Sequence, residues 1–100
     1  MNTEAEFAAL LGRVSASDTA FLTELGPLVL SAVALGLAAD TRSLARAFEV
    51  AHAHVIRECS HLADDLSLVT AEDRGETSGR LHVSLTEAGR QLARLGEAAE

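Results

Sequence analysis

The chain contains no tryptophan, tyrosine or lysine, and it has a single cysteine and a single proline. Its three aromatic residues are Phe7, Phe21 and Phe48, so a hydrophobic core has to be built mainly from leucine, valine and alanine. One cysteine cannot form a disulfide within the chain, which favours a reducing compartment such as the cytoplasm. The longest apolar run, residues 26–39, is shorter than a membrane span.

One hundred residues are enough for one small domain. The N-terminal residues do not combine basic groups, an apolar stretch and a cleavage site. We therefore expect no secretory signal, no membrane partner and a cytoplasmic location. A domain of this size buries only about two-thirds of the surface of its unfolded chain, so contact with a second subunit would help to stabilise it.

The formal net charge is −7, which argues against nucleic-acid binding because cations are needed to neutralise phosphates. The acidic excess is uneven, however. Residues 1–40 contain five acidic residues and one arginine, whereas residues 41–94 contain eight acidic residues and seven arginines. The second part is nearly neutral, and the planar fork of arginine suits phosphates and guanine edges.

The spacing of apolar residues predicts helices through the first two-thirds of the chain. We expect helices over residues 4–14 and 18–25, and a mostly apolar core helix over 27–38 with Pro27 in its first turn. Asp40 or Thr41 would cap a short helix over 41–48.

A longer helix is expected over residues 52–66. One side of this helix is predicted to face the core, because it carries an apolar stripe made of Ala51, Val55, Cys59, Leu62 and Leu66. Cys59 would accordingly be a small buried residue and not a redox sensor.

Residues 66–90 have the pattern of a β-hairpin followed by a helix. A short apolar run from Leu66 to Val69 precedes a charged, glycine-containing stretch, residues 72–80. In the next run Leu81, Val83 and Leu85 alternate with His82 and Ser84, which is typical of a strand with one buried face. Thr86 is the expected N-cap of a last helix over 86–97, with Glu87 in its first turn.

This order of elements resembles the winged helix-turn-helix regulators of the MarR-like (multiple antibiotic resistance regulator) family over about residues 28–94. The most specific match is Leu85-Thr86-x-Ala88-Gly89-Arg90, at the junction of wing and final helix. Further matching residues are Leu44, Ala45, Val50, Val55, Arg57, Leu68, Val69, Asp73 and Arg74. At the bend between the two helices, where the family usually has glycine because φ is positive, this chain has Glu49.

The resemblance implies a mainly α fold with a small β-hairpin wing, in which a three-helix core is joined by the wing and by flanking helices. Residues 1–100 would form one winged helix-turn-helix domain. Its parts would be N-terminal helices over 1–26 with a possible role in dimerisation, the winged-helix core over 27–85 and a C-terminal helix over 86–100. A homodimer is expected, with helices 4–14, 18–25 and 86–97 as candidate dimer surfaces.

The resemblance also implies a DNA-binding transcriptional regulator that reads double-stranded DNA with the helix near 52–66 and the wing over 70–82. Arg57 is the best candidate for a base contact. The candidate DNA-binding residues are Arg42, Arg46, His52, His54, Arg57, Ser60, His61, Arg74 and Arg80. Alternatively, this face is only solvated, with Arg42 paired to Asp40 and Arg46 to Glu49.

A second hypothesis is a winged helix used for protein contact, as an adaptor or antirepressor with little DNA affinity. The acidic N-terminal half favours this possible protein partner. No glycine-rich phosphate cradle or nucleophile motif is present, so we expect neither an enzyme nor a cofactor. His54, Glu58, His61 and Asp65 have a spacing that suggests metal ligands. Because His54 and His61 are separated by a rise of about 10.5 Å, we expect no metal site there.

Overall fold

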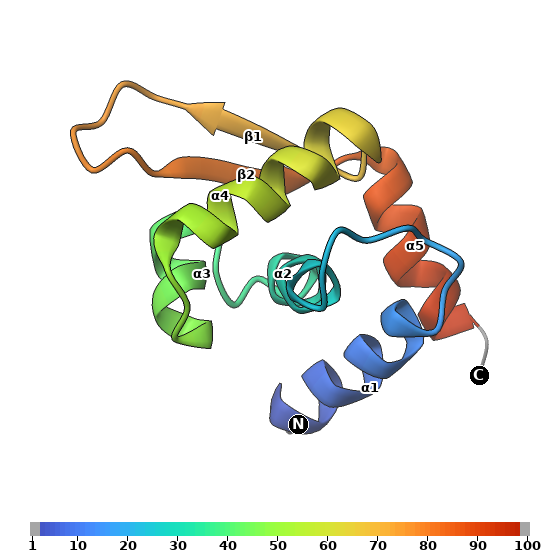
Figure 1. Cartoon of the computed structure of the whole chain (residues 1–100). Coiled ribbons are helices and arrows are strands. Elements are labelled where there is room, and N and C mark those ends of the chain that lie inside the picture. Colours follow the sequence, from blue (N-terminus) through green and yellow to red (C-terminus); the bar gives the residue numbers. More distant parts are fainter. Residues whose placement is uncertain (1–2, 99–100) are drawn as a thin grey trace.

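The structure is a computed structural model that describes residues 3–98, with the side chains up to residue 93. Residues 99 and 100 of the expected C-terminal segment 86–100 lie outside the described residues. The elements are α1 (Thr3–Ser15), α2 (Leu25–Ala34), α3 (Thr41–Phe48), α4 (His52–Ser60), the π-helical turn η1 (His61–Asp65), β1 (Val69–Asp73), β2 (Leu81–Leu85) and α5 (Glu87–Ala98) (Figure 1). The described chain is mainly helical with one antiparallel hairpin, as predicted, and this is compatible with a winged helix.

Helix α2 lies at the centre of the molecule and is seen nearly end-on in Figure 1, with the other helices around it. Its apolar sequence predicted this position, and Val29 and Leu30 are fully buried. The hairpin extends outward beside α4. The core consists of Leu10, Val14, Val29, Leu30, Ala32, Leu44, Ala45, Val55, Cys59, Leu62, Leu68, Val69 and Val83.

Helix α2 covers a different range from the predicted 27–38. It begins two residues before Pro27, which lies within its first turn. An N–H in the first turn has no acceptor within the helix, so the missing N–H of proline costs no hydrogen bond there. It ends early because Gly36 has a φ of 72°. The amide of Leu37 then donates to the carbonyl of Ala32 (2.9 Å) and that of Gly36 to Val33 (3.1 Å), the pattern of a Schellman motif.

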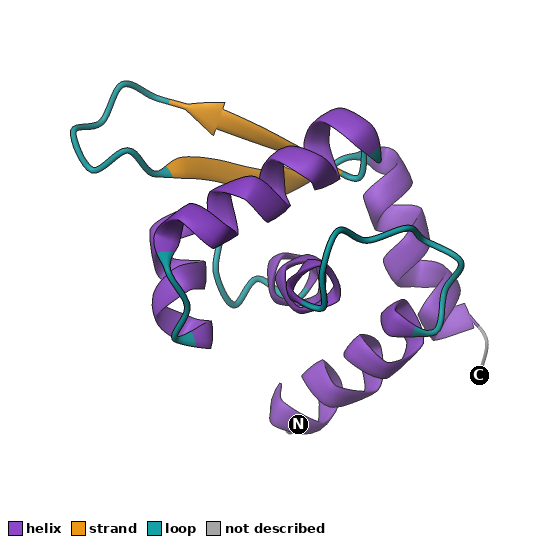
Figure 2. Cartoon of the chain, viewed as in Figure 1, coloured by secondary structure: helices purple, strands orange, loops and turns teal. Residues whose placement is uncertain are grey.

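The predicted helix over residues 18–25 is wrong, because residues 16–24 form the loop between α1 and α2 (Figure 2). The Ser17 hydroxyl donates back to the carbonyl of Val14 (2.7 Å) and so closes the end of α1. Thr23 accepts a hydrogen bond from the amide of Leu25 (3.1 Å) just before α2 begins. The N-terminal part of the chain therefore contributes one helix and one long loop.

Helices α3 and α4 form the expected helix pair. Asp40 is the N-cap of α3 and accepts a hydrogen bond from the amide of Ser43 (2.8 Å). The helix ends at Glu49, which adopts a left-handed conformation with φ 54° and ψ 47°. The amide of Val50 donates back to the carbonyl of Ala45 (3.0 Å), so Glu49 takes the place that glycine usually has in such a motif.

Helix α4 and η1 together cover the predicted helix over 52–66. Val55, Cys59 and Leu62 of the predicted stripe are fully buried, whereas Ala51 is exposed. The last turn is wider than an α-helix, because the amide of Leu66 donates to the carbonyl of His61 (3.1 Å).

The hairpin pairs Val69 with Leu85 and Asp73 with Leu81, so its first strand begins later than the predicted Leu66. The outer edge of β2 also pairs with the segment before α3. The amide of Val83 donates to the carbonyl of Ala39 (2.8 Å), and Asp40 forms a bridge with His82. The base of the hairpin is thereby attached to the helix pair.

The junction motif after the hairpin has a clear packing reason. Thr86 caps α5, as predicted, by accepting a hydrogen bond from the amide of Gly89 (3.1 Å). Its own amide donates to the carbonyl of Leu68 (3.0 Å). A Cβ atom on Gly89 would lie 2.1 Å from that same carbonyl oxygen. Only glycine allows α5 to approach the start of the hairpin this closely.

Candidate nucleic-acid interface

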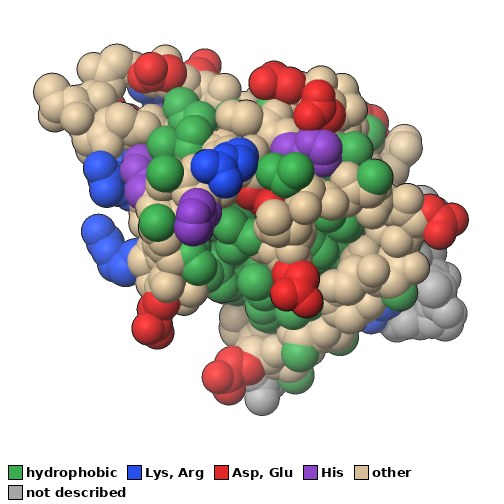
Figure 3. Space-filling view, viewed as in Figure 1, with side chains coloured by type: hydrophobic (Ala, Val, Ile, Leu, Met, Phe, Trp, Pro, Cys, Tyr) green, Lys and Arg blue, Asp and Glu red, His purple; other side chains and the backbone are tan. Residues whose placement is uncertain are grey.

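The surface of α3 and α4 carries an excess of positive charge, although the whole chain has a net charge of −7. Its exposed charged side chains are three arginines, Arg42, Arg46 and Arg57, and one acid, Glu49. The second acidic residue of this segment, Glu58, is only 1% exposed. Figure 3 shows arginine and histidine side chains gathered over α3 and α4, with acidic side chains mostly around the edge of this face.

Three of the predicted site residues on this face are available to a ligand. Arg46, His54 and Arg57 are exposed, and none of their side chains has a hydrogen bond or ion pair with another described residue. Ser60 lies one turn beyond Arg57 and is half-buried. The expected pair between Arg46 and Glu49 is not formed.

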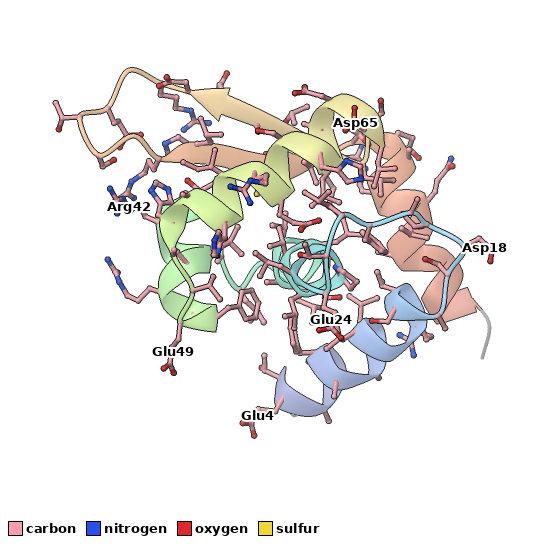
Figure 4. The ribbon with its side chains drawn as sticks, viewed as in Figure 1. Glu4, Asp18, Glu24, Arg42, Glu49 and Asp65 are labelled. Carbon is pink, nitrogen blue, oxygen red and sulfur yellow. The ribbon has the colours of Figure 1, made fainter. Side chains whose placement is uncertain are left out.

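Two other predicted residues hold the hairpin tip against α3. Arg42 donates from Nε (3.2 Å) and Nη2 (2.9 Å) to the carbonyl of Ser78, and so does not pair with Asp40 (Figure 4). Arg80 lies 3.6 Å from Asp40 and 3.8 Å from Glu76. Burial raises the pKa of Asp40, but the hydrogen bonds from Ser43 and the charge of Arg80 outweigh it and leave this pKa below its usual value.

Arg74 is the remaining arginine of the hairpin. Its Nε lies 2.7 Å from Oε1 of Glu72, and both side chains are well exposed. The hydrogen bond and charge of Arg74 lower the pKa of Glu72. Because exposed pairs of this kind exchange readily with solvent and with other ions, Arg74 remains accessible to an anionic partner.

His52 connects three elements and carries no charge. Its Nε2 lies 2.7 Å from the hydroxyl of Thr41, and that hydroxyl oxygen accepts a hydrogen bond from the amide of Leu81 (2.9 Å). The Thr41 hydroxyl is therefore free to donate its hydrogen to a neutral His52. Burial, followed by the charges of Arg42 and Arg80, lowers the pKa of His52 and favours this neutral form.

His61 was expected near the DNA, but both of its ring nitrogens face the protein. Nδ1 lies 2.7 Å from Oδ2 of Asp65, and Nε2 lies 2.9 Å from the carbonyl of Ala20. Both partners are acceptors, so the protonated ring, which carries hydrogen on both nitrogens, satisfies both contacts. The Ala20 carbonyl, and then Asp65, raise the pKa of His61 accordingly. His61 thus attaches the loop over 16–24 to η1.

The four residues whose spacing suggested metal ligands, His54, Glu58, His61 and Asp65, do not form one exposed flank, because Glu58 is buried. Its Oε1 accepts a hydrogen bond from the hydroxyl of Thr23 (2.6 Å). The burial of Glu58 was not predicted, although its spacing of three from Val55 and four from Leu62 places it near the core stripe. Among residues 3–98, no group of three or more His, Cys, Asp or Glu side chains is arranged to hold a metal ion.

Cys59 is fully buried, as predicted. Burial and the neighbouring Glu58 raise the pKa of its thiol to about 12, so the reactive thiolate is not formed near neutral pH.

None of the described helices has the length and apolar character needed to cross a membrane. No family model matches the chain, and no curated protein matches it in sequence.

Proposed function

We propose that the chain is a winged helix-turn-helix transcriptional regulator of MarR-like type that binds double-stranded DNA. One observation carries the proposal: an acidic chain has a positive, largely unpaired surface on the two helices that a helix-turn-helix protein presents to DNA. The adjoining hairpin provides a further exposed cation, Arg74.

In this proposal α4 enters the major groove. Arg57 contacts a base edge, because its guanidinium is exposed and has no partner among the described residues. Arg46 and His54 reach backbone phosphates, and Arg74 at the hairpin contacts a neighbouring phosphate or the minor groove. Arg42 and Arg80 act mainly by fixing the direction of the hairpin relative to α3.

A homodimer fits this function, because two weakly attractive subunits gain affinity when they bind two half-sites together. The half-sites would lie about 34 Å apart, one duplex turn. Helices α1 and α5 remain the candidate dimer surfaces, whereas residues 18–25 are no longer a candidate helix. No enzymatic activity and no cofactor are part of this proposal.

Fluorescence anisotropy with a labelled random duplex tests the proposal. Affinity should fall linearly on a log–log plot as salt rises, with a slope set by the number of phosphates neutralised. Replacing Arg57 by Ala should weaken a specific site by about 1–3 kcal/mol and relax the preference at one base position. Arg57→Lys is a matched control, because it keeps the positive charge and removes the planar fork that binds a base edge.

A winged helix that binds a protein partner, as an adaptor or antirepressor, is the second candidate. The acidic residues 1–40 and the net charge of −7 favour it, since they repel phosphate and resemble the charge of DNA. A chain that retains no random duplex even at low salt would support this candidate and contradict DNA binding.

A further inference from the structure

Two hydrogen bonds hold the loop over residues 16–24 against the helices beneath it. The carbonyl of Ala20 lies 2.9 Å from Nε2 of His61, and the hydroxyl of Thr23 donates to Oε1 of Glu58 (2.6 Å). Between these two points the ring of Phe21 packs against α2, since a Cβ atom on Gly26 would come within 2.7 Å of it. The loop therefore closes over the place where α2 and α4 meet.

The closed loop covers a carboxylate oxygen that has no partner. Glu58 is 1% exposed, and its Oε2 has no hydrogen-bond partner among the described residues. This oxygen lies beside Gly26, on the same side as Phe21. Because an unsatisfied buried carboxylate oxygen is costly, access of water to Glu58 favours an open loop. The contacts that keep the loop closed must outweigh this cost.

The contact made by His61 is complete only while the ring carries two hydrogens. Nδ1 lies 2.7 Å from Oδ2 of Asp65, and both this oxygen and the carbonyl of Ala20 are acceptors. A neutral ring has one hydrogen, so one of its nitrogens then faces an acceptor with a lone pair. If the hydrogen is on Nδ1, the bond to the loop is lost. If it is on Nε2, that bond is no longer charge-assisted, and the carboxylate of Asp65 repels the lone pair on Nδ1.

The surroundings of His61 favour its protonated form. The charged residues of η1, α4 and the loop are Asp64, Asp65, Arg57, Glu58, Asp18 and Glu24, of which five are acidic. The one cation, Arg57, is exposed and its side chain has no hydrogen bond or ion pair with another described residue. The Ala20 carbonyl, followed by Asp65, raises the pKa of His61. The ring therefore loses its proton at a pH above the usual histidine value of about 6.5.

We propose that His61 is a proton-dependent switch that holds the loop over 16–24 closed. A protonated ring keeps the loop over Gly26 and Glu58. A neutral ring releases its hold, and water then reaches Phe21 and Glu58. The loop also borders the pocket that His54 and Arg57 line from α4, so opening changes the surface beside these two side chains. The switch is a property of the fold and does not depend on DNA binding.

NMR of the full chain between pH 6 and pH 9 tests the switch. The nuclear Overhauser effect between the ring of Phe21 and Gly26 should be strong at pH 6 and weaken with the same midpoint as the titration of the His61 ring. The amides of Leu25 and Gly26 donate to the hydroxyl and carbonyl of Thr23 (3.1 Å each). Their hydrogen-exchange protection factors, which correct for the effect of pH on a free amide, should fall by about tenfold.

Asp65→Asn separates a proton switch from a merely structural contact. The amide of asparagine can donate to Nδ1, which leaves the hydrogen of a neutral ring on Nε2 for the carbonyl of Ala20. The loop should therefore stay closed at pH 9 as well as at pH 6 in this variant. Asp64→Asn is the matched control, because it removes the same charge from the neighbouring exposed position, and it should open at pH 9 like the unmodified chain.

His61→Ala should give weak protection of Leu25 and Gly26 at both pH values. The switch is wrong if the contact between Phe21 and Gly26 keeps its intensity up to pH 9 in the unmodified chain. It is also wrong if Asp65→Asn opens at pH 9 to the same extent as Asp64→Asn. Should His61→Ala not fold, these two observations still decide. A failure to bind duplex in the anisotropy experiment would contradict the proposed function alone.

Discussion

Replacing Glu49 by glycine should stabilise the protein. Glu49 ends α3 in a left-handed conformation, with φ 54° and ψ 47°. Its side chain is exposed and projects away from the molecule (Figure 4), and it has no hydrogen bond or ion pair with another described residue. The substitution therefore changes the backbone preference and one surface charge, and it removes no packing contact of the buried core.

The magnitude follows from two opposing effects. A residue with a Cβ atom loses about 1–2 kcal/mol in the left-handed region, and glycine avoids this cost. Glycine also makes the unfolded chain more flexible. The additional conformational entropy lost on folding offsets the gain by about 0.5–1 kcal/mol. The free energy of unfolding should rise by about 0.5–1 kcal/mol. Since 1 kcal/mol corresponds to about 4–8 °C for a domain of this size, Tm should rise by roughly 2–8 °C.

Glu49→Gln is the control, because it removes the same charge and retains the Cβ atom. A negative charge at the C-terminal end of α3 is unfavourable, so this variant should gain only about 0.3 kcal/mol. Urea unfolding followed by circular dichroism, with both variants at one salt concentration, measures the difference. If Glu49→Gly is no more stable than Glu49→Gln, the assignment of strain to this bend is refuted.

Three further predictions concern single glycine and histidine residues. Gly89→Ala should lower the free energy of unfolding by about 1–3 kcal/mol, because its Cβ atom would lie 2.1 Å from the carbonyl of Leu68. Gly12→Ala, at an open position of α1, should instead raise the free energy of unfolding by about 0.5–1 kcal/mol. Denaturation curves in which Gly89→Ala is the more stable variant would contradict the close packing of Gly89 at the junction. For His61 the raised pKa means that its stabilisation is fully present below the unfolded pKa of about 6.5 and is lost as pH rises through the higher folded value. Hence His61→Ala should be more destabilising at pH 6 than at pH 9, with His54→Ala as the control, and an equal effect at both pH values would exclude a charged His61. Finally, any DNA affinity should rise from pH 8 to pH 6 at fixed salt, because histidine as a residue type gains positive charge toward acidic pH, and affinity that is flat or weaker over this range would contradict the prediction.

The sequence was sufficient where a local pattern decides the structure. Asp40 and Thr86 cap their helices as predicted, because an N-cap satisfies amides only two or three residues away. The apolar character of α2 predicted its central place, and the alternation of residues 81–85 predicted the second strand of the hairpin. These features depend on the spacing of side chains along a helix or strand, which is written directly in the sequence.

Residues 16–24 and the candidate site were decided by the tertiary structure. The helical pattern of residues 18–25 was not realised, because Thr23 is hydrogen-bonded to α4 and the carbonyl of Ala20 to η1. The partners of Glu58 and His61 lie 35 and 41 residues away in the chain. No local period encodes such contacts.

The sequence by itself thus determined most of the helices, the presence of the hairpin, the positions of two helix caps and the presence of an arginine-rich half in an acidic chain. Only the tertiary structure decided which arginines of α3 and α4 remain unpaired, because the partner of Arg42 lies 36 residues away in the chain. Arg42 and Arg80 are used to hold the hairpin against α3, whereas Arg46 and Arg57 face outward. The buried acceptor of Glu58 likewise arises only where the loop over 16–24 packs against α4.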